Sequence, residues 1–131
     1  MNLYDIPLFG MLRVKMDWLT ERQNALAENI ANSSTQDYKA RDLKPLDFDA
    51  LVKRAQGLAT QSNTPPGQLS VSLGQKGYDA QDLRDGEMTP NGNSVVLEEQ
   101  MMKESETQVQ FQTALDIYQS GVSMLRTAIG R

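Results

Sequence analysis

The sequence contains neither cysteine nor histidine. Without cysteine, the chain cannot form disulfide bonds, thiolate zinc sites or a cysteine nucleophile. Without histidine, it lacks the commonest metal ligand, the usual general base near neutral pH and any Ser-His-Asp triad. The nucleotide-binding patterns G-x-x-x-x-G-K-[ST] and G-x-G-x-x-G are also missing. We therefore expect a protein that is not an enzyme and that has no catalytic residue, no metal site and no cofactor.

Long apolar runs and basic clusters are missing as well. No segment approaches the roughly 20 apolar residues of a membrane span, and the first residues lack the basic and apolar regions of a secretory signal peptide. The net charge is −4, whereas nucleic-acid binding and polybasic membrane binding both depend on Lys and Arg. The composition therefore argues against nucleic acid as a partner. It predicts a chain that is cytosolic or that leaves the cell without a cleaved signal.

Large aliphatic residues and phenylalanine are scarce, close to the roughly 20% level below which chains tend to stay disordered. Most of them lie in the first and last thirds of the chain. A chain of 131 residues forms one domain at most, so we expect a single domain over 1–131. This domain is expected to fold only marginally until it meets its partners.

Apolar residues in the first third recur at alternating steps of three and four, which predicts a helix over 8–32. Pro7 suits the first turn of such a helix. The polar run at 32–35 favours a turn that ends it. The expected seam of this helix, interrupted at Gln23, consists of Phe9, Leu12, Met16, Leu19, Leu26 and Ile30.

The same spacing in the last third predicts a second long helix over 94–130. Ser94 is a good N-cap residue, and Glu98 and Glu99 near the start suit the helix dipole. Glu104 and Gln108 interrupt the apolar pattern. The expected seam consists of Leu97, Met101, Phe111, Leu115, Tyr118, Val122, Leu125 and Ile129.

The middle of the chain is less regular. An extended segment is expected over 33–46 and a short helix over 47–59, with apolar residues on one face. Proline and glycine gather in 60–93, which predicts a long loop with room for a short β-hairpin. An acidic stretch within this loop does not match the calcium-binding EF-hand template, so we interpret it as solvated. Its residues are Asp79, Asp82, Asp85 and Glu87.

These elements predict a mainly α fold in which the two long helices pair as a coiled-coil-like hairpin around an irregular middle. An ordinary helical-hairpin core and an assembly interface shared between subunits both explain the seams, and periodicity alone favours the former. A second set of apolar residues is left for neighbours in either case. Its members are Val14, Trp18, Met102, Val109, Ile117 and Met124.

One motif resembles a known family. The segment 26–32, Leu-Ala-Glu-Asn-Ile-Ala-Asn, and the residues after it resemble the N-terminal signature A-N-I-A-N-x-x-T-P-G-Y-K of the flagellar rod and hook proteins. Gln36 and Asp37 stand where that signature has Pro and Gly. The matching residues are Asn29, Ile30, Ala31, Asn32, Thr35, Tyr38, Lys39, Ala40, Arg41 and Asp42.

The start and end of the predicted second helix, 90–103 and 123–129, resemble the short proximal rod proteins of this family. The distal rod and hook members are longer because they carry an inserted domain. The length therefore leaves two proximal rod types. FlgC is one of them, and segment 38–42 favours the other.

The resemblance implies a structural subunit of the proximal rod of the bacterial flagellar basal body. Such subunits leave through the flagellar type III export apparatus without a cleaved signal peptide, assemble helically in the periplasm and transmit motor torque. The implied partners are further copies of the chain, rod proteins of the FlgC, FlgF and FlgG types and the adaptor FliE. The membrane ring and the export gate lie nearby, and no small-molecule substrate is implied.

Two other classes fit parts of the sequence. A helical export chaperone or adaptor of the flagellar type III system would also be acidic and helical. A wall hydrolase would need a carboxylate pair in the loop at 79–87. The signature at 29–42 favours the rod subunit over the chaperone, and the absence of histidine, cysteine and any clustered catalytic motif argues against the hydrolase.

Overall fold

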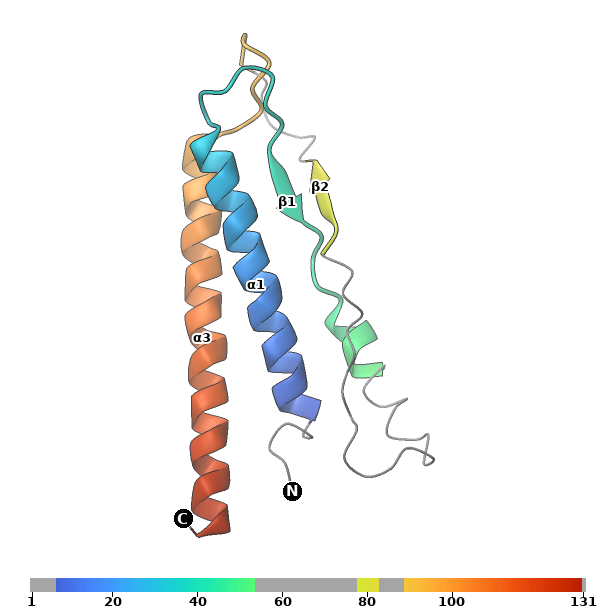
Figure 1. The fold of residues 1–131 in the computed structure, drawn as a ribbon, viewed down its shortest axis with the longest axis vertical. Coiled ribbons are helices and arrows are strands. Elements are labelled where there is room, and N and C mark those ends of the chain that lie inside the picture. Colours follow the sequence, from blue (N-terminus) through green and yellow to red (C-terminus); the bar gives the residue numbers. More distant parts are fainter. Residues whose placement is uncertain (1–6, 54–77, 83–88, 131) are drawn as a thin grey trace.

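The computed structural model describes residues 7–53, 78–82 and 89–130. Its elements follow in the order α1 (Pro7–Ala31), β1 (Arg41–Leu43), β2 (Ala80–Asp82) and α3 (Leu97–Ile129). The two long helices run antiparallel, side by side, and α3 continues past the start of α1 (Figure 1). The predicted fold class is confirmed: the protein is mainly helical, its terminal helices pack together, and a short helical segment at 48–53 and a small sheet complete it.

Helix α1 buries or half-buries its large apolar residues within the subunit, except for the exposed Leu8. Phe9, Leu19 and Leu26 are buried, as the expected seam requires. Val14 and Trp18 are buried too, so the expectation that these two residues are free for neighbours was wrong. The reason is that α1 packs against two partners, α3 and the segment around β1, and therefore buries a wider stripe than one helix contact needs.

Helix α3 begins three residues later than predicted. Its N-cap is Val96, which has an extended backbone and no side-chain capping bond. Ser94 was expected to cap the helix, but its Oγ accepts a hydrogen bond from the backbone N–H of Ala40 at 3.0 Å. At the other end Gly130 adopts a left-handed conformation with φ 79°, and its N–H bonds to the last carbonyls of the helix.

The face of α3 that packs on α1 consists of small and polar residues. Gln100, Thr107 and Ala114 are buried at intervals of seven residues. Gly121 continues this row, and a Cβ atom there would lie 2.9 Å from Cζ of the Phe9 ring. The helices therefore approach closely at this point, where the Phe9 ring of α1 fills the space beside Gly121 of α3.

The predicted α3 seam lies partly beside this face. Phe111, Leu115, Tyr118, Val122 and Leu125 are half-buried, and the Tyr118 ring meets the Phe9 ring edge-on, with centroids 5.3 Å apart. Three members are exposed in the subunit, so their assignment to the helix pair was wrong. They are Leu97, Met101 and Ile129.

The middle of the chain contributes a strap, residues 38–46, that runs beside α1 (Figure 1). Within the strap, β1 pairs antiparallel with β2, and Asp42 lies opposite Gln81. Strand β2 falls in the stretch predicted to be a loop, because its sequence, Ala-Gln-Asp, gives no strand signal. Two members of the acidic stretch form exposed ion pairs with the strap: Asp79 with Lys44 and Asp82 with Arg41.

Other predictions for the middle fall outside the described residues. These are the second half of the short helix, most of the loop predicted over 60–93 and the carboxylates Asp85 and Glu87. The described part of the middle packs against α1. Leu43 of β1 forms a buried cluster with Trp18 and Leu19 of α1. Partly buried residues from several elements surround this cluster, namely Leu46, Tyr78 and Phe111. Neither described helix has an apolar stretch of the kind that crosses a membrane.

Candidate functional site at the joined end of the hairpin

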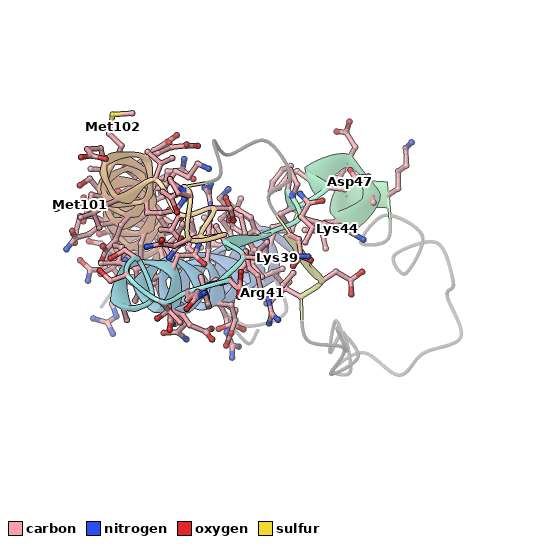
Figure 2. All side chains as sticks on the ribbon, turned by 90° about the horizontal axis from the view of Figure 1, so that it is seen from above. Lys39, Arg41, Lys44, Asp47, Met101 and Met102 are labelled. Atoms are coloured by element: carbon pink, nitrogen blue, oxygen red, sulfur yellow. The ribbon has the colours of Figure 1, made fainter. Side chains whose placement is uncertain are left out.

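The motif residues gather at one end of the helical hairpin, which we call the joined end. Here α1 ends, α3 begins, and the turns at 32–37 and 89–93 lie together at the top of Figure 1. Figure 2 shows this end from above, with Lys39 and Arg41 on the strap and Met101 and Met102 pointing outward from α3. Two buried asparagines hold the joined end together.

Asn29 is completely buried and connects three elements. Its Nδ2 donates to the carbonyl of Arg41 at 2.6 Å and to Oε1 of Gln100 at 2.8 Å. Its Oδ1 accepts from the backbone N–H of Arg41 at 3.0 Å and from the hydroxyl of Tyr38 at 3.3 Å. Both amide protons and both oxygen lone pairs are therefore engaged. One side chain of α1 thus fixes the positions of the strap and of α3.

Asn93 closes the end of α1. Its Nδ2 lies 3.0, 2.9 and 2.7 Å from the carbonyl oxygens of Asn32, Ser33 and Thr35. Its Oδ1 accepts from the backbone N–H of Val95 at 2.7 Å. The carbonyls at the end of a helix have no partners within the helix. The Asn32 carbonyl also accepts from the backbone N–H of Thr35, and the Asn93 amide supplies a further donor to the carbonyls of this turn. No buried side-chain nitrogen or oxygen within the described residues is without a partner.

The turn after α1 contains a strained residue. Asp37 has φ 56°, a left-handed conformation that residues other than glycine rarely adopt. Its N–H donates to the carbonyl of Asn91 at 3.1 Å, and its carboxylate fills the space that a Cβ atom on Gly92 would occupy. The flagellar signature has glycine at the position of Asp37. The backbone keeps the geometry that suits glycine, although this chain has aspartate there.

Two side chains of α1 hold the strap below the joined end. Arg22 donates from Nε and Nη2 to the two carboxylate oxygens of Asp42, both at 3.0 Å, in a largely buried bidentate pair. Trp18 donates from Nε1 to the carbonyl of Lys44 at 3.0 Å. The Arg22 guanidinium and the Lys15 ammonium lie 5.4 and 5.0 Å from the centroid of the Trp18 ring, which favours cation–π attraction.

Burial and a neighbouring negative charge both affect the pKa of Tyr38. Its pKa is raised above the ordinary tyrosine value, first by burial and then by the nearby carboxylate of Glu28, while Arg41 opposes the shift. The neutral hydroxyl is therefore favoured, which agrees with its role as a donor to Asn29.

The ten motif residues have different surroundings. Asn32 and Thr35 form hydrogen bonds within the turn: Asn32 Nδ2 donates to the carbonyl of Glu28, and Thr35 Oγ1 donates to Asn32 Oδ1. The remaining members divide by exposure: Asn29, Ala40 and Asp42 are buried, Ile30 and Tyr38 are half-buried, and Ala31, Lys39 and Arg41 are exposed.

The seam of α1 that was predicted from sequence is less exposed than that of α3. Besides its buried members, Leu12, Met16 and Ile30 are half-buried. Sequence reasoning missed Asn93, Gln100 and Arg22, because polar side chains give no apolar signal. A spacing of seven from Gln100 to Thr107 and Ala114, ending at Gly121, was the pattern that would have identified the inner face of α3. Within the described residues, no group of three or more metal-ligating side chains could hold a metal ion.

Comparisons with known proteins agree with the motif. The chain is 28% identical over 133 residues to flagellar basal body rod protein FlgB of Agrobacterium fabrum, and the match covers 99% of this chain and 98% of the relative. It is 34% identical over 110 residues to FlgB of Cereibacter sphaeroides, covering 82% of each chain. FlgB of Aeromonas hydrophila is 29% identical over 126 residues, covering 92% of this chain and 91% of the relative.

A scan against protein-family models finds no match. The relatives nevertheless align along most of the chain, so the similarity extends well beyond the short motif. The resemblance to flagellar rod proteins that the sequence suggested is confirmed.

Proposed function

The chain belongs to the FlgB family of flagellar basal body rod proteins, and from this membership we propose that it is a structural subunit of the proximal rod. In this role it assembles helically with further subunits and transmits motor torque. The observation that carries the proposal is the fixed joined end, where Asn29 and Asn93 lock two long helices and the strap into one unit.

A subunit that transmits torque must resist bending between its parts. The hydrogen bonds of Asn29 cross from α1 to both the strap and α3, and the Arg22–Asp42 pair fixes the strap at a second point. Two attachment points prevent the strap from rotating about either of them. This arrangement supports a load-bearing role.

A helical rod also requires contacts that do not close on themselves. A surface that contacts a different surface on the next copy, repeated around an axis, produces an open helical array. Helix α3 exposes apolar residues along most of its length, and such surfaces commonly mark protein–protein contacts. The apolar exposure of the single subunit is thereby accounted for in the assembled rod.

Family membership also suggests partners and a route. We propose that the chain leaves through the flagellar type III apparatus without a cleaved signal and resides in the periplasmic part of the basal body. Its neighbours are then rod proteins of the FlgC, FlgF and FlgG types and the adaptor FliE. The relatives reported above are named FlgB, which favours a rod subunit over an export chaperone and over FlgC itself.

The proposal is tested by mass spectrometry of detergent-isolated basal bodies from the source bacterium. We expect this chain in those particles with the other rod proteins. We also expect a deletion strain to be non-motile and to regain motility when the gene is returned. Complete rods from a strain in which the chain occurs only in the cytosol would contradict the proposal.

A further inference from the structure

The turn at 89–93 contains the dipeptide Asn91–Gly92, which is the one asparagine–glycine pair in the sequence. The side-chain amide of an asparagine can be attacked by the backbone nitrogen of the next residue, which closes a small imide ring. A side chain on that next residue hinders the attack, and glycine has none. Every other asparagine of the chain precedes a residue with a side chain. The sequence therefore favours Asn91 over the other asparagines as a site of deamidation.

Asn91 also lies where solvent reaches it. It is exposed at the joined end of the hairpin, in the turn at the top of Figure 1. Asn29 and Asn93, which hold this end together, are instead buried, with 0% and 4% of their surface exposed. Asn24 is exposed but lies within α1, where the regular backbone keeps the next N–H in a helical hydrogen bond. Position in the fold therefore favours Asn91 as well.

Backbone hydrogen bonds hold this dipeptide in place in the folded chain. The N–H of Gly92 donates to the carbonyl of Thr89 at 2.9 Å, and the carbonyl of Asn91 accepts from the N–H of Asp37 at 3.1 Å. The carbonyl of Asn93 accepts from the backbone N–H and the hydroxyl of Thr89, at 2.9 and 3.1 Å. A backbone nitrogen whose N–H is engaged in this way is not free to attack. The reaction therefore requires the turn to open locally.

We propose that Asn91 is the principal deamidation site of this chain and that it reacts when the turn at 89–93 opens. The Gly92 nitrogen then forms a bond to Cγ of Asn91, and the side-chain nitrogen leaves as ammonia with the proton that Gly92 loses. Water opens the resulting imide at either of its two carbonyls. One opening yields aspartate, and the other yields isoaspartate, in which the main chain continues through the side chain. The reaction needs no partner, so it takes place whether or not the chain is a rod subunit.

Isoaspartate at position 91 weakens the contact between the two turns of the joined end. The carbonyl that accepts from the N–H of Asp37 becomes a carboxylate, and the extra carbon in the main chain displaces Gly92. The Asp37 carboxylate already occupies the space beside Gly92. A second negative charge next to it is unfavourable, because like charges repel. Deamidation therefore loosens the joined end where the turns at 32–37 and 89–93 meet.

The site is tested on the purified full chain, incubated at mildly alkaline pH and mapped by mass spectrometry that distinguishes isoaspartate from aspartate. We expect deamidation at Asn91 before any other asparagine, with both products present. Asn91→Gln is the matched control and should stay unmodified at this position, because ring closure from the longer side chain is slower. An Asn91 that stays intact, or that reacts later than another asparagine, would overturn the proposal.

A pair of threonine variants tests the opening step. Thr89→Val removes the hydroxyl that donates to the Asn93 carbonyl. It should accelerate deamidation at Asn91 about five-fold, the change in open population that corresponds to one lost hydrogen bond. Thr20→Val removes a comparable bond within α1 and should leave the rate unchanged. Circular dichroism verifies that both variants keep their helices. Equal rates in Thr89→Val and the native chain would show that the turn does not control the reaction, which overturns the proposed opening step.

Discussion

The two long helices use their apolar residues in opposite ways. Helix α1 buries Phe9, Trp18, Leu19 and Leu26 inside the subunit and exposes charged side chains. Helix α3 places small and polar residues against α1 and leaves many of its apolar residues exposed. The difference indicates that α1 organises the subunit, whereas α3 offers its surface to other molecules. Apolar periodicity alone does not reveal which of the two roles a helix has.

The largest expected effect comes from a charge in the α1 core. Leu19 is fully buried in the cluster with Trp18 and Leu43, so Leu19→Asp should destabilise the subunit by several kcal/mol, about 3–5. Leu125→Asp, on the half-buried part of α3, should cost less stability. Both variants should fail to assemble. Denaturant unfolding of each purified variant measures its free energy of unfolding. Equal losses of stability in the two variants would contradict the different roles assigned to α1 and α3.

Removal of the central amide should have the next largest effect. Asn29→Ala leaves buried partners on Gln100 and Arg41 without their hydrogen bonds, at a cost of about 2–3 kcal/mol. Asn32→Ala, in the same motif, removes two exposed hydrogen bonds, one to the carbonyl of Glu28 and one from Thr35 Oγ1, and should cost about 1 kcal/mol or less. The denaturant midpoints of the two variants compare how much each asparagine contributes to stability. A smaller loss for Asn29→Ala than for Asn32→Ala would refute the connecting role of Asn29.

Relief of backbone strain should stabilise the joined end modestly. Asp37→Gly removes a side chain from a left-handed residue and should add about 0.5–1 kcal/mol. Gly92→Ala should destabilise the native chain, because its φ of 75° and the carboxylate of Asp37 both oppose a Cβ atom there. Part of this loss should disappear when Asp37→Gly is also present. A full, unchanged loss in the double variant would show that the two turns do not interact as described.

The smallest effect is expected at alkaline pH. Burial, followed by the carboxylates of Asp17 and Glu21, raises the pKa of Tyr78, and the folded state therefore favours the neutral phenol. The resulting stability is fully present below the unfolded tyrosine pKa of about 10 and is lost as pH rises through the higher folded value. Tyr78→Phe should make the free energy of unfolding fall less steeply above about pH 10. An unchanged slope would show that this tyrosine does not contribute to alkaline unfolding.

The sequence allowed prediction of those parts of the fold that produce an apolar period. The repeats around Leu19 and Leu26 located α1, and the repeat from Phe111 to Leu125 located most of α3. The inner face of α3 was not recognised, because Gln100, Thr107 and Ala114 fit by being small or by forming hydrogen bonds. Strand β2 was missed for a similar reason, since Ala80, Gln81 and Asp82 acquire strand structure only by pairing with β1.

The sequence indicated where the candidate site lies, but not the hydrogen bonds and ion pairs that hold it together. The motif at 29–42 includes Asn29 and lies at the joined end of the hairpin. The bonds of Asn93 to the turn after α1 and the pair between Arg22 and Asp42 depend on contacts between residues far apart in the sequence. Such contacts cannot be predicted from local spacing, because each polar residue alone is equally compatible with a solvated surface.

The central claim, that α3 serves neighbouring molecules while α1 serves the subunit, is tested most directly by Val109→Asp. The stability of the purified variant and its incorporation into basal bodies are measured together. Because Val109 is exposed, the account predicts an unfolding free energy within about 0.5 kcal/mol of the native chain, together with loss of the variant from basal bodies. Normal incorporation into functional rods, or a large loss of subunit stability, would contradict the claim.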